Sequence, residues 1–169
     1  LENIDTQSPY EIIFVDDSSD DNTFLNIKAI NLQNNNVKIL RLARRSGSHI
    51  ATKAGIDASS GDKLLVISGD GQEDPVLIKD MISNIADGFD IVWGVRDVRE
   101  ENLFSRLVTK IFYKGLVRFT KNTTNYSVDI SNADFYMLSN KVINELKKAS
   151  LKNSSLFGLL AWVGFKQTS

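Results

Sequence analysis

The chain contains no cysteine and a single histidine, His49. The absence of cysteine excludes disulfides, thiol nucleophiles and thiolate metal sites, and it fits a reducing compartment. A metal ion would therefore need oxygen ligands or His49. Lys and Arg number 20 against 21 Asp and Glu, so the net charge of -1 gives no general reason to expect nucleic acid as a partner.

Long apolar runs are also absent. No segment approaches the roughly 20 apolar residues that a membrane-spanning helix needs. The longest candidate, Leu156–Phe165, is too short and contains two glycines, and the first residues lack the basic and then apolar pattern of a signal peptide. We therefore expect a soluble chain, and 169 residues with 42% hydrophobic content are enough for a single domain spanning residues 1–169.

Short apolar runs alternate with stretches of helical periodicity. The runs are rich in β-branched residues and are bounded by Asp, Asn, Ser or Gly, as strands are. The intervening stretches repeat apolar residues three and four positions apart, as helices do. The expected strands are Tyr10–Val15, Val37–Leu42, Lys63–Ser68 and Phe89–Gly94, and the expected helices are Asp20–Gln33, Gly47–Gly61 and Asp74–Gly88. This alternation predicts an α/β fold with a doubly wound, mainly parallel sheet and helices on both faces.

Two acidic clusters follow expected strands. Asp16–Asp21 comes after the first strand, and Ser68–Asp74 comes at the end of the third. Ligands bind at the carboxyl ends of strands in such sheets, and carboxylate and amide oxygens suit Mg²⁺ or Mn²⁺, which would neutralise a bound diphosphate. The alternative is that these residues only end strands and cap helices.

The ordered series of motifs resembles glycosyltransferase family 2, in particular the branch that transfers sugar from a nucleotide donor to polyprenyl phosphate, the dolichyl-phosphate mannose synthase type. The matching segments are Val15–Asp20, Arg44–Gly55, Ala58–Asp62, Ser68–Pro75, Gly94–Arg96, Asn102–Lys121, Asn132–Phe135 and Gly158–Phe165. The resemblance implies a GT-A-like fold and an inverting hexosyltransferase. It also implies a UDP- or GDP-linked sugar as the donor and a polyprenyl phosphate or a glycan as the acceptor.

The resemblance assigns binding roles to individual residues. Asp16, Asp17 and Arg44 would bind the nucleotide, and Asp17 is favoured over Asp16 as the direct contact. Asp70 and Gln72 would bind the metal cofactor, Mg²⁺ or Mn²⁺, next to the diphosphate, so Asp70 also counts as a nucleotide-binding residue.

The candidate catalytic residues are Asp70, Arg96 and Asp134. The resemblance implies that Arg96 contacts phosphate, a task that suits the rigid donor fork of guanidinium, although a surface arginine paired with Asp97 or Glu100 is the alternative. Asp134 would act as general base if the acceptor is a sugar hydroxyl. With an ionised phosphate acceptor it would only orient the acceptor or bind metal.

The segment Asn102–Lys121 combines an apolar stripe with a basic residue at every fourth position. These basic residues are Arg106, Lys110, Lys114 and Arg118. Such a helix can lie in a membrane interface and attract a lipid phosphate, or it can pack on the core with a solvated basic face. The resemblance favours contact with the membrane and the acceptor, at the cytoplasmic inner face of the membrane in the full-length protein.

The chain also departs from the family pattern. The family's first strand, which lies centrally in the sheet, and the membrane helices expected after Phe165 have no counterpart, so we expect a domain truncated at both ends. Two exposed sheet edges would then favour a homo-oligomer. Ser68 replaces an Asp of the family, which predicts weaker metal binding or a preference for Mn²⁺, and Arg45 replaces an Asn.

Two other functions remain open from the sequence. A phosphorylation-switched receiver domain is also a parallel α/β fold with an acid pair after one strand and an acceptor Asp after a later one, and Asp16, Asp17 and Asp70 fit that outline. The other alternative is a catalytically inactive, glycosyltransferase-like binding module.

Overall fold

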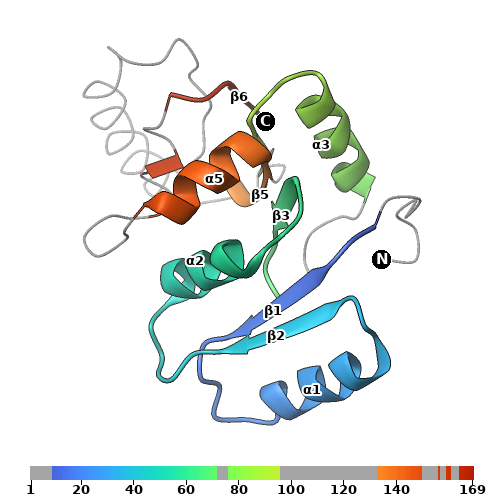
Figure 1. Cartoon of the computed structure of the whole chain (residues 1–169), viewed down its shortest axis with the longest axis vertical. Coiled ribbons are helices and arrows are strands. Elements are labelled where there is room, and N and C mark those ends of the chain that lie inside the picture. Colours follow the sequence, from blue (N-terminus) through green and yellow to red (C-terminus); the bar gives the residue numbers. More distant parts are fainter. Residues whose placement is uncertain (1–8, 72–75, 96–132, 150–155, 157–158, 161–163) are drawn as a thin grey trace, which may run out of the picture.

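The structure is a computed structural model that describes residues 9–71, 76–95, 133–149, 156, 159–160 and 164–169. Strands and helices alternate along this part of the chain (Figure 1). The strands are β1 (Ile12–Asp16), β2 (Val37–Arg41), β3 (Lys63–Val66), β4 (Ile91–Val95), β5 (Ala133–Ser139) and β6 (Gln167–Thr168). The helices are α1 (Thr23–Gln33), α2 (Ser48–Ala58), α3 (Val76–Ala86) and α5 (Asn140–Lys148).

The described strands form two sheets. β1 and β2 pair in parallel, and the second sheet has the order β3-β5-β4-β6. Because β5 is antiparallel to both β3 and β4, and β6 is parallel to β4, β5 is the one strand of the second sheet that runs against the others. The predicted α/β fold with mainly parallel strands is therefore confirmed, with β5 as the exception. The expectation that the family's central first strand is missing stays a prediction.

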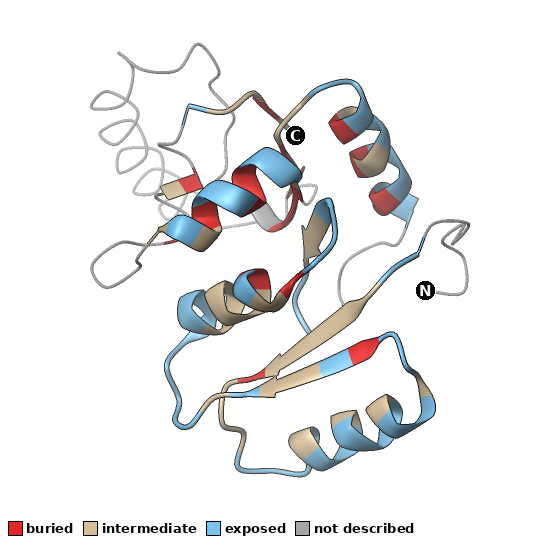
Figure 2. Cartoon of the chain, in the orientation of Figure 1, coloured by how far each residue is buried: buried red, intermediate tan, exposed pale blue. Residues whose placement is uncertain are grey.

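Helices pack on both faces of the second sheet. Neighbouring residues of β4 point to opposite faces, as the two-residue period of a strand requires. Trp93 packs in a cluster with residues of α2 and α5, whereas Val92 packs with residues of α3. The largest fully buried side chains belong to these two clusters. Buried residues of α3 and α5 are red in Figure 2. The predicted helical cover of both faces is confirmed.

The starts of β1, β2 and β3 are tied together by one carboxylate. Glu11, directly before β1, forms an ion pair of 2.6 Å with Lys38 of β2. Its Oε1 also accepts hydrogen bonds from the backbone amides of Ser60 and Gly61, just before β3. These contacts place the start of β3 beside the starts of β1 and β2.

Helix α1 packs less closely than the others. It lies along the β2 side of the β1–β2 pair, whereas α2 lies on the β1 side (Figure 1). None of its residues is buried, and Leu25 and Leu32 are largely exposed. Among the described residues, no helix is long and apolar enough to cross a membrane.

Candidate functional site

Asp16, the last residue of β1, carries a buried carboxylate next to the loop between β1 and α1. The Asp16 side chain has no exposed surface. Its Oδ1 accepts a hydrogen bond of 3.1 Å from the backbone amide of Ser19, and its Oδ2 lies 3.3 Å from Nε of Arg41. Through these contacts with Ser19 and Arg41, Asp16 helps to fix the loop that follows β1. Its contact with a nucleotide stays a prediction.

Asp17, the next residue, joins this loop to the one between β2 and α2. Its Oδ1 accepts a hydrogen bond from the amide of Ser46, and its Oδ2 accepts one from the amide of Gly47, each at 2.8 Å. Gly47 precedes the first residue of α2, so the carboxylate lies at the positive end of that helix. Each carboxylate oxygen can accept a further hydrogen bond, so Asp17 remains able to accept one from a ligand.

The turn after Asp17 uses an unusual backbone conformation. Ser18 has a φ of 60°, in the left-handed region that residues with a side chain seldom adopt. Further along the loop, hydrogen bonds from Thr23 lower the pKa of Asp21. Asp21 is therefore ionised at neutral pH and faces the start of α1, where a negative charge is favourable.

Two arginines, Arg44 and Arg45, lie in the loop between β2 and α2. Arg45 Nη2 forms an ion pair of 2.6 Å with Asp20, which is a second link between the loops. Arg44 is exposed, and within the described part of the chain no carboxylate pairs with its guanidinium. Arg45 is therefore neutralised by Asp20, whereas Arg44, two residues before Ser46, is available to an anion.

Asp70 lies in the loop that follows β3. This loop is exposed from Ile67 to Gly71, and it includes Ser68. Gly71 has a φ of 70°, a conformation that glycine adopts without strain. The described residues contain no group of three His, Cys, Asp or Glu side chains able to hold a metal. A single carboxylate with an amide neighbour nevertheless suits Mg²⁺, which is often held by one or two carboxylates, waters and substrate phosphates.

The strand register places the backbone of Asp134 beside the end of β4. Gly94 pairs with Phe135 and Val95 with Ala133, with an irregularity between these two pairs. Asp134, between Ala133 and Phe135, therefore lies opposite the last two residues of β4. A Cβ at Gly94 would overlap the ring of Phe135, so this close packing requires glycine.

Several predicted site residues lie outside the described residues. They are Gln72, Arg96, Arg106, Lys110, Lys114 and Arg118. The side chain of Asp134 is not described either, although its backbone is part of β5. Their roles stay predictions.

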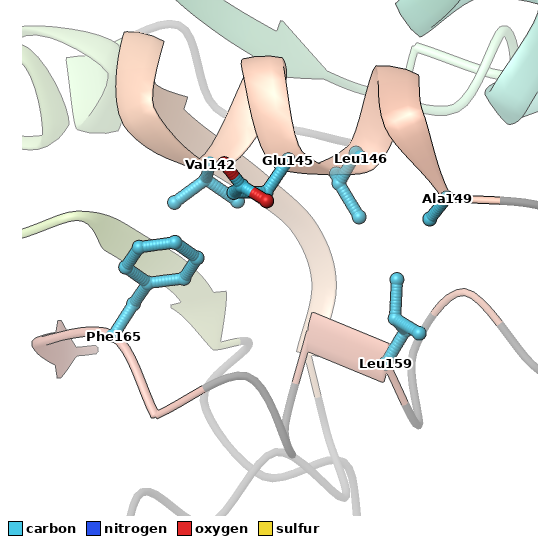
Figure 3. Close-up of a pocket in the computed structure, with 6 residues that line it drawn as sticks. All are labelled: Val142, Glu145, Leu146, Ala149, Leu159 and Phe165. Atoms are coloured by element: carbon cyan, nitrogen blue, oxygen red, sulfur yellow. The ribbon is translucent and has the colours of Figure 1, made fainter.

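A cavity of about 170 Å³ lies between α5 and the chain segments that carry Leu159 and Phe165. Apolar side chains make up most of its wall, and among the described residues that line it Glu145 of α5 is the one that is charged (Figure 3). None of the predicted site residues that the structure describes lines it.

Sequence reasoning missed Arg41, the residue that contacts the buried Asp16. The available signal is a charged residue at the end of an apolar run, next in space to an acidic loop if the two strands are parallel neighbours. The observed β1–β2 register pairs Asp16 with Arg41 directly.

Comparisons with known proteins identify relatives of the chain. The model of a protein family described as "Glycosyl transferase family 2" matches residues 1–147. The chain is 35% identical over 165 residues to the uncharacterized glycosyltransferase YkcC of Bacillus subtilis, covering 97% of this chain and 50% of that protein. It is 34% identical over 113 residues to the undecaprenyl-phosphate 4-deoxy-4-formamido-L-arabinose transferase of Yersinia enterocolitica, covering 66% of this chain and 35% of that protein. The chain thus spans about half the length of the first of these relatives.

A solved structure shares the fold. The mannosyltransferase PcManGT from Pyrobaculum calidifontis, in complex with GDP-Man and Mn²⁺, superposes with a TM-score of 0.63 at 14% identity, covering 94% of this chain and 45% of that chain. At this identity the similarity concerns the fold, and it confirms the expected GT-A-like architecture.

Proposed function

The chain belongs to glycosyl transferase family 2, and from this premise we propose that the protein transfers a sugar from a nucleotide-sugar donor to a polyprenyl phosphate. The acceptor class is supported by the Yersinia relative, because its name combines undecaprenyl phosphate with the transfer of a sugar. A nucleotide-sugar donor and a divalent metal are supported by the solved mannosyltransferase, which holds GDP-Man and Mn²⁺.

The observation that carries the proposal is the Asp17 carboxylate, which joins the two loops that follow the adjacent parallel strands β1 and β2. The second of these loops also carries the exposed Arg44. The Asp17 carboxylate is fixed by two amides and can accept a hydrogen bond from a ligand N–H. Arg44, without a carboxylate partner among the described residues, offers charged donors to an anion. A nucleoside diphosphate has both groups, since its base carries an N–H and its phosphates are anionic.

The chemical step follows from the proposed arrangement. An acceptor oxygen attacks C1 of the sugar, the bond between C1 and the diphosphate oxygen breaks, and the configuration at C1 inverts. Arg96 stabilises the leaving diphosphate through hydrogen bonds as charge builds on it. Asp134 orients the acceptor, and it takes the proton if the acceptor is a hydroxyl. Asp70 and Gln72 would hold Mg²⁺ or Mn²⁺, and the ion would supply positive charge next to the diphosphate.

The basic residues of Asn102–Lys121 complete the proposal on the acceptor side. Arg106, Lys110, Lys114 and Arg118 attract the lipid phosphate and anionic head groups, and they hold this segment at the membrane surface on the cytoplasmic side. Replacing all four by Gln should weaken binding to vesicles that contain anionic lipid, with no change for neutral vesicles.

A transfer assay tests the function. The full-length protein is incubated with UDP- and GDP-linked hexoses, undecaprenyl phosphate and Mn²⁺ or Mg²⁺, and the lipid product is identified by mass spectrometry. We expect one donor to yield a sugar-lipid, with loss of at least about 100-fold in rate for Asp70→Asn and parental activity for Asp80→Asn, a control on the surface of α3. Nucleotide binding without transfer to any acceptor would instead identify the inactive binding module.

A further inference from the structure

Arg41, the last residue of β2, makes three contacts with the end of β1, the β1–α1 loop and the start of α1. Its Nε lies 3.3 Å from Oδ2 of the buried Asp16. Its Nη2 donates a hydrogen bond of 3.0 Å to the backbone carbonyl of Ser19. Its guanidinium lies 4.6 Å from the centre of the Phe24 ring, in the first turn of α1. One side chain thus contacts the start of the loop, its middle and the helix that follows.

The buried carboxylate depends on this arginine. Asp16 Oδ2 is shielded from solvent and has no hydrogen-bond partner in the described part of the chain. In the described part of the chain, Arg41 is the residue that forms an ion pair with this oxygen. A buried carboxylate without a compensating charge is strongly unfavourable, so removal of Arg41 would force Asp16 and its loop to rearrange.

We propose that Arg41 is a positioning residue for nucleotide binding, which acts with Asp16 to fix the loop that carries Asp17. This inference rests on the proposed function. Asp17 directly follows Asp16, and the Ser19 carbonyl held by Arg41 lies two residues after Asp17. The two points that Arg41 fixes therefore bracket the residue that faces the ligand.

The task suits arginine better than lysine. Guanidinium is a planar fork that can meet a carboxylate and a carbonyl at once and can stack on an aromatic ring. Lysine would keep the charge near Asp16 and would lose the geometry that reaches Ser19. Arg41→Lys should therefore fall between the parent and Arg41→Gln in its effect on the ligand.

The test measures how UDP and GDP bind to the full-length protein with Mn²⁺, by isothermal titration calorimetry. We expect Arg41→Gln to raise the dissociation constant of the preferred nucleotide about 10-fold and Arg41→Lys to raise it about 3-fold. In the transfer assay, the kcat of both variants at saturating donor should stay within about twofold of the parent value. Lys38→Gln is the matched control. It removes another cation of β2, whose ion pair with Glu11 lies at the opposite end of the strand, and it should leave the dissociation constant unchanged.

A double-mutant cycle separates positioning from a general loss of stability. If Arg41 acts through the placement of Asp17, then Arg41→Gln should weaken binding much less in an Asp17→Ala background than in the parent. Circular dichroism confirms that each variant is folded, and Arg41→Lys supplies the test if Arg41→Gln does not fold.

The outcomes distinguish this inference from the proposed function. Parental nucleotide affinity in both Arg41 variants, or losses that simply multiply in the cycle, would overturn the positioning role while the nucleotide site stands. A parent protein that binds neither UDP nor GDP would overturn the proposed function, and the role of Arg41 with it.

Discussion

Replacing Glu11 with Gln removes one negative charge from the point where the starts of β1, β2 and β3 meet. Burial of this carboxyl raises its pKa, but hydrogen bonds from Lys38 and Ser60 outweigh the burial and lower the pKa from 4.5 to about 2. Gln retains an oxygen that can accept the hydrogen bonds from Ser60 and Gly61. The substitution therefore isolates the contribution of the charge.

The magnitude follows from the pKa. At about 1.4 kcal/mol for each pKa unit, the full shift corresponds to about 3 kcal/mol. The Lys38 side chain is 50% exposed, whereas that of Glu11 is 20% exposed, so solvent screens their attraction. We therefore expect Glu11→Gln to lower the free energy of unfolding at pH 7 by about 1–2 kcal/mol.

The contribution of the Glu11 charge to the free energy of unfolding depends on pH. Because the pKa of Glu11 is lower in the folded state, the charge stabilises the fold fully above pH 4.5, and the contribution is lost as the pH falls toward 2. Urea unfolding of the parent and of Glu11→Gln should give curves that differ at pH 7 and approach each other over this window. Glu145→Gln, which removes an exposed surface ion pair with Lys148, should change little. A difference between parent and Glu11→Gln that stays constant from pH 7 to pH 2.5 would refute the reasoning.

Two further substitutions test the local backbone near the site. Gly94→Ala should lower the free energy of unfolding by about 1–3 kcal/mol in urea melts, because its Cβ would overlap the buried ring of Phe135. Gly69→Ala is the control, since a Cβ at that position would meet open space. Equal effects at both positions would contradict the packing argument. Ser18→Gly should raise the free energy of unfolding by about 0.5–1 kcal/mol, since Ser18 has a φ of 60°. Ser19→Gly, outside the left-handed region, should not stabilise, and a stabilisation as large as that of Ser18→Gly would count against strain at Ser18.

The elements that carry the site follow closely from the sequence. The apolar runs before Asp16 and Asp70 predict β1 and β3. Asp16 is the last residue of β1, one residue beyond the expected end of that strand, and Asp70 lies in the loop after β3, as expected. Helix α1 begins at Thr23 rather than at Asp20, because Asp20 pairs with Arg45 and Asp21 accepts a hydrogen bond from the amide of Thr23. The helical pattern alone does not reveal such competing contacts.

The order of the second sheet could not be read from the sequence. β5 follows β4 along the chain yet lies between β3 and β4, and this arrangement depends on contacts between residues far apart in sequence. The continuous apolar run from Phe135 to Leu138 is compatible with a strand covered on both faces, and it does not specify the direction of that strand. The role of Arg41 was equally hidden, because it depends on the β1–β2 register and on the loop conformation around Ser18.

Metal-dependent nucleotide binding tests the central claim most directly. In a thermal-shift measurement on the full-length protein, UDP or GDP should raise the melting temperature in the presence of Mn²⁺, because a ligand that binds the folded state stabilises it. Asp70→Asn should abolish the Mn²⁺-dependent part of this shift, and Asp80→Asn should retain it. A nucleotide shift of the same size with and without Mn²⁺, or one unaffected by Asp70→Asn, would contradict the account.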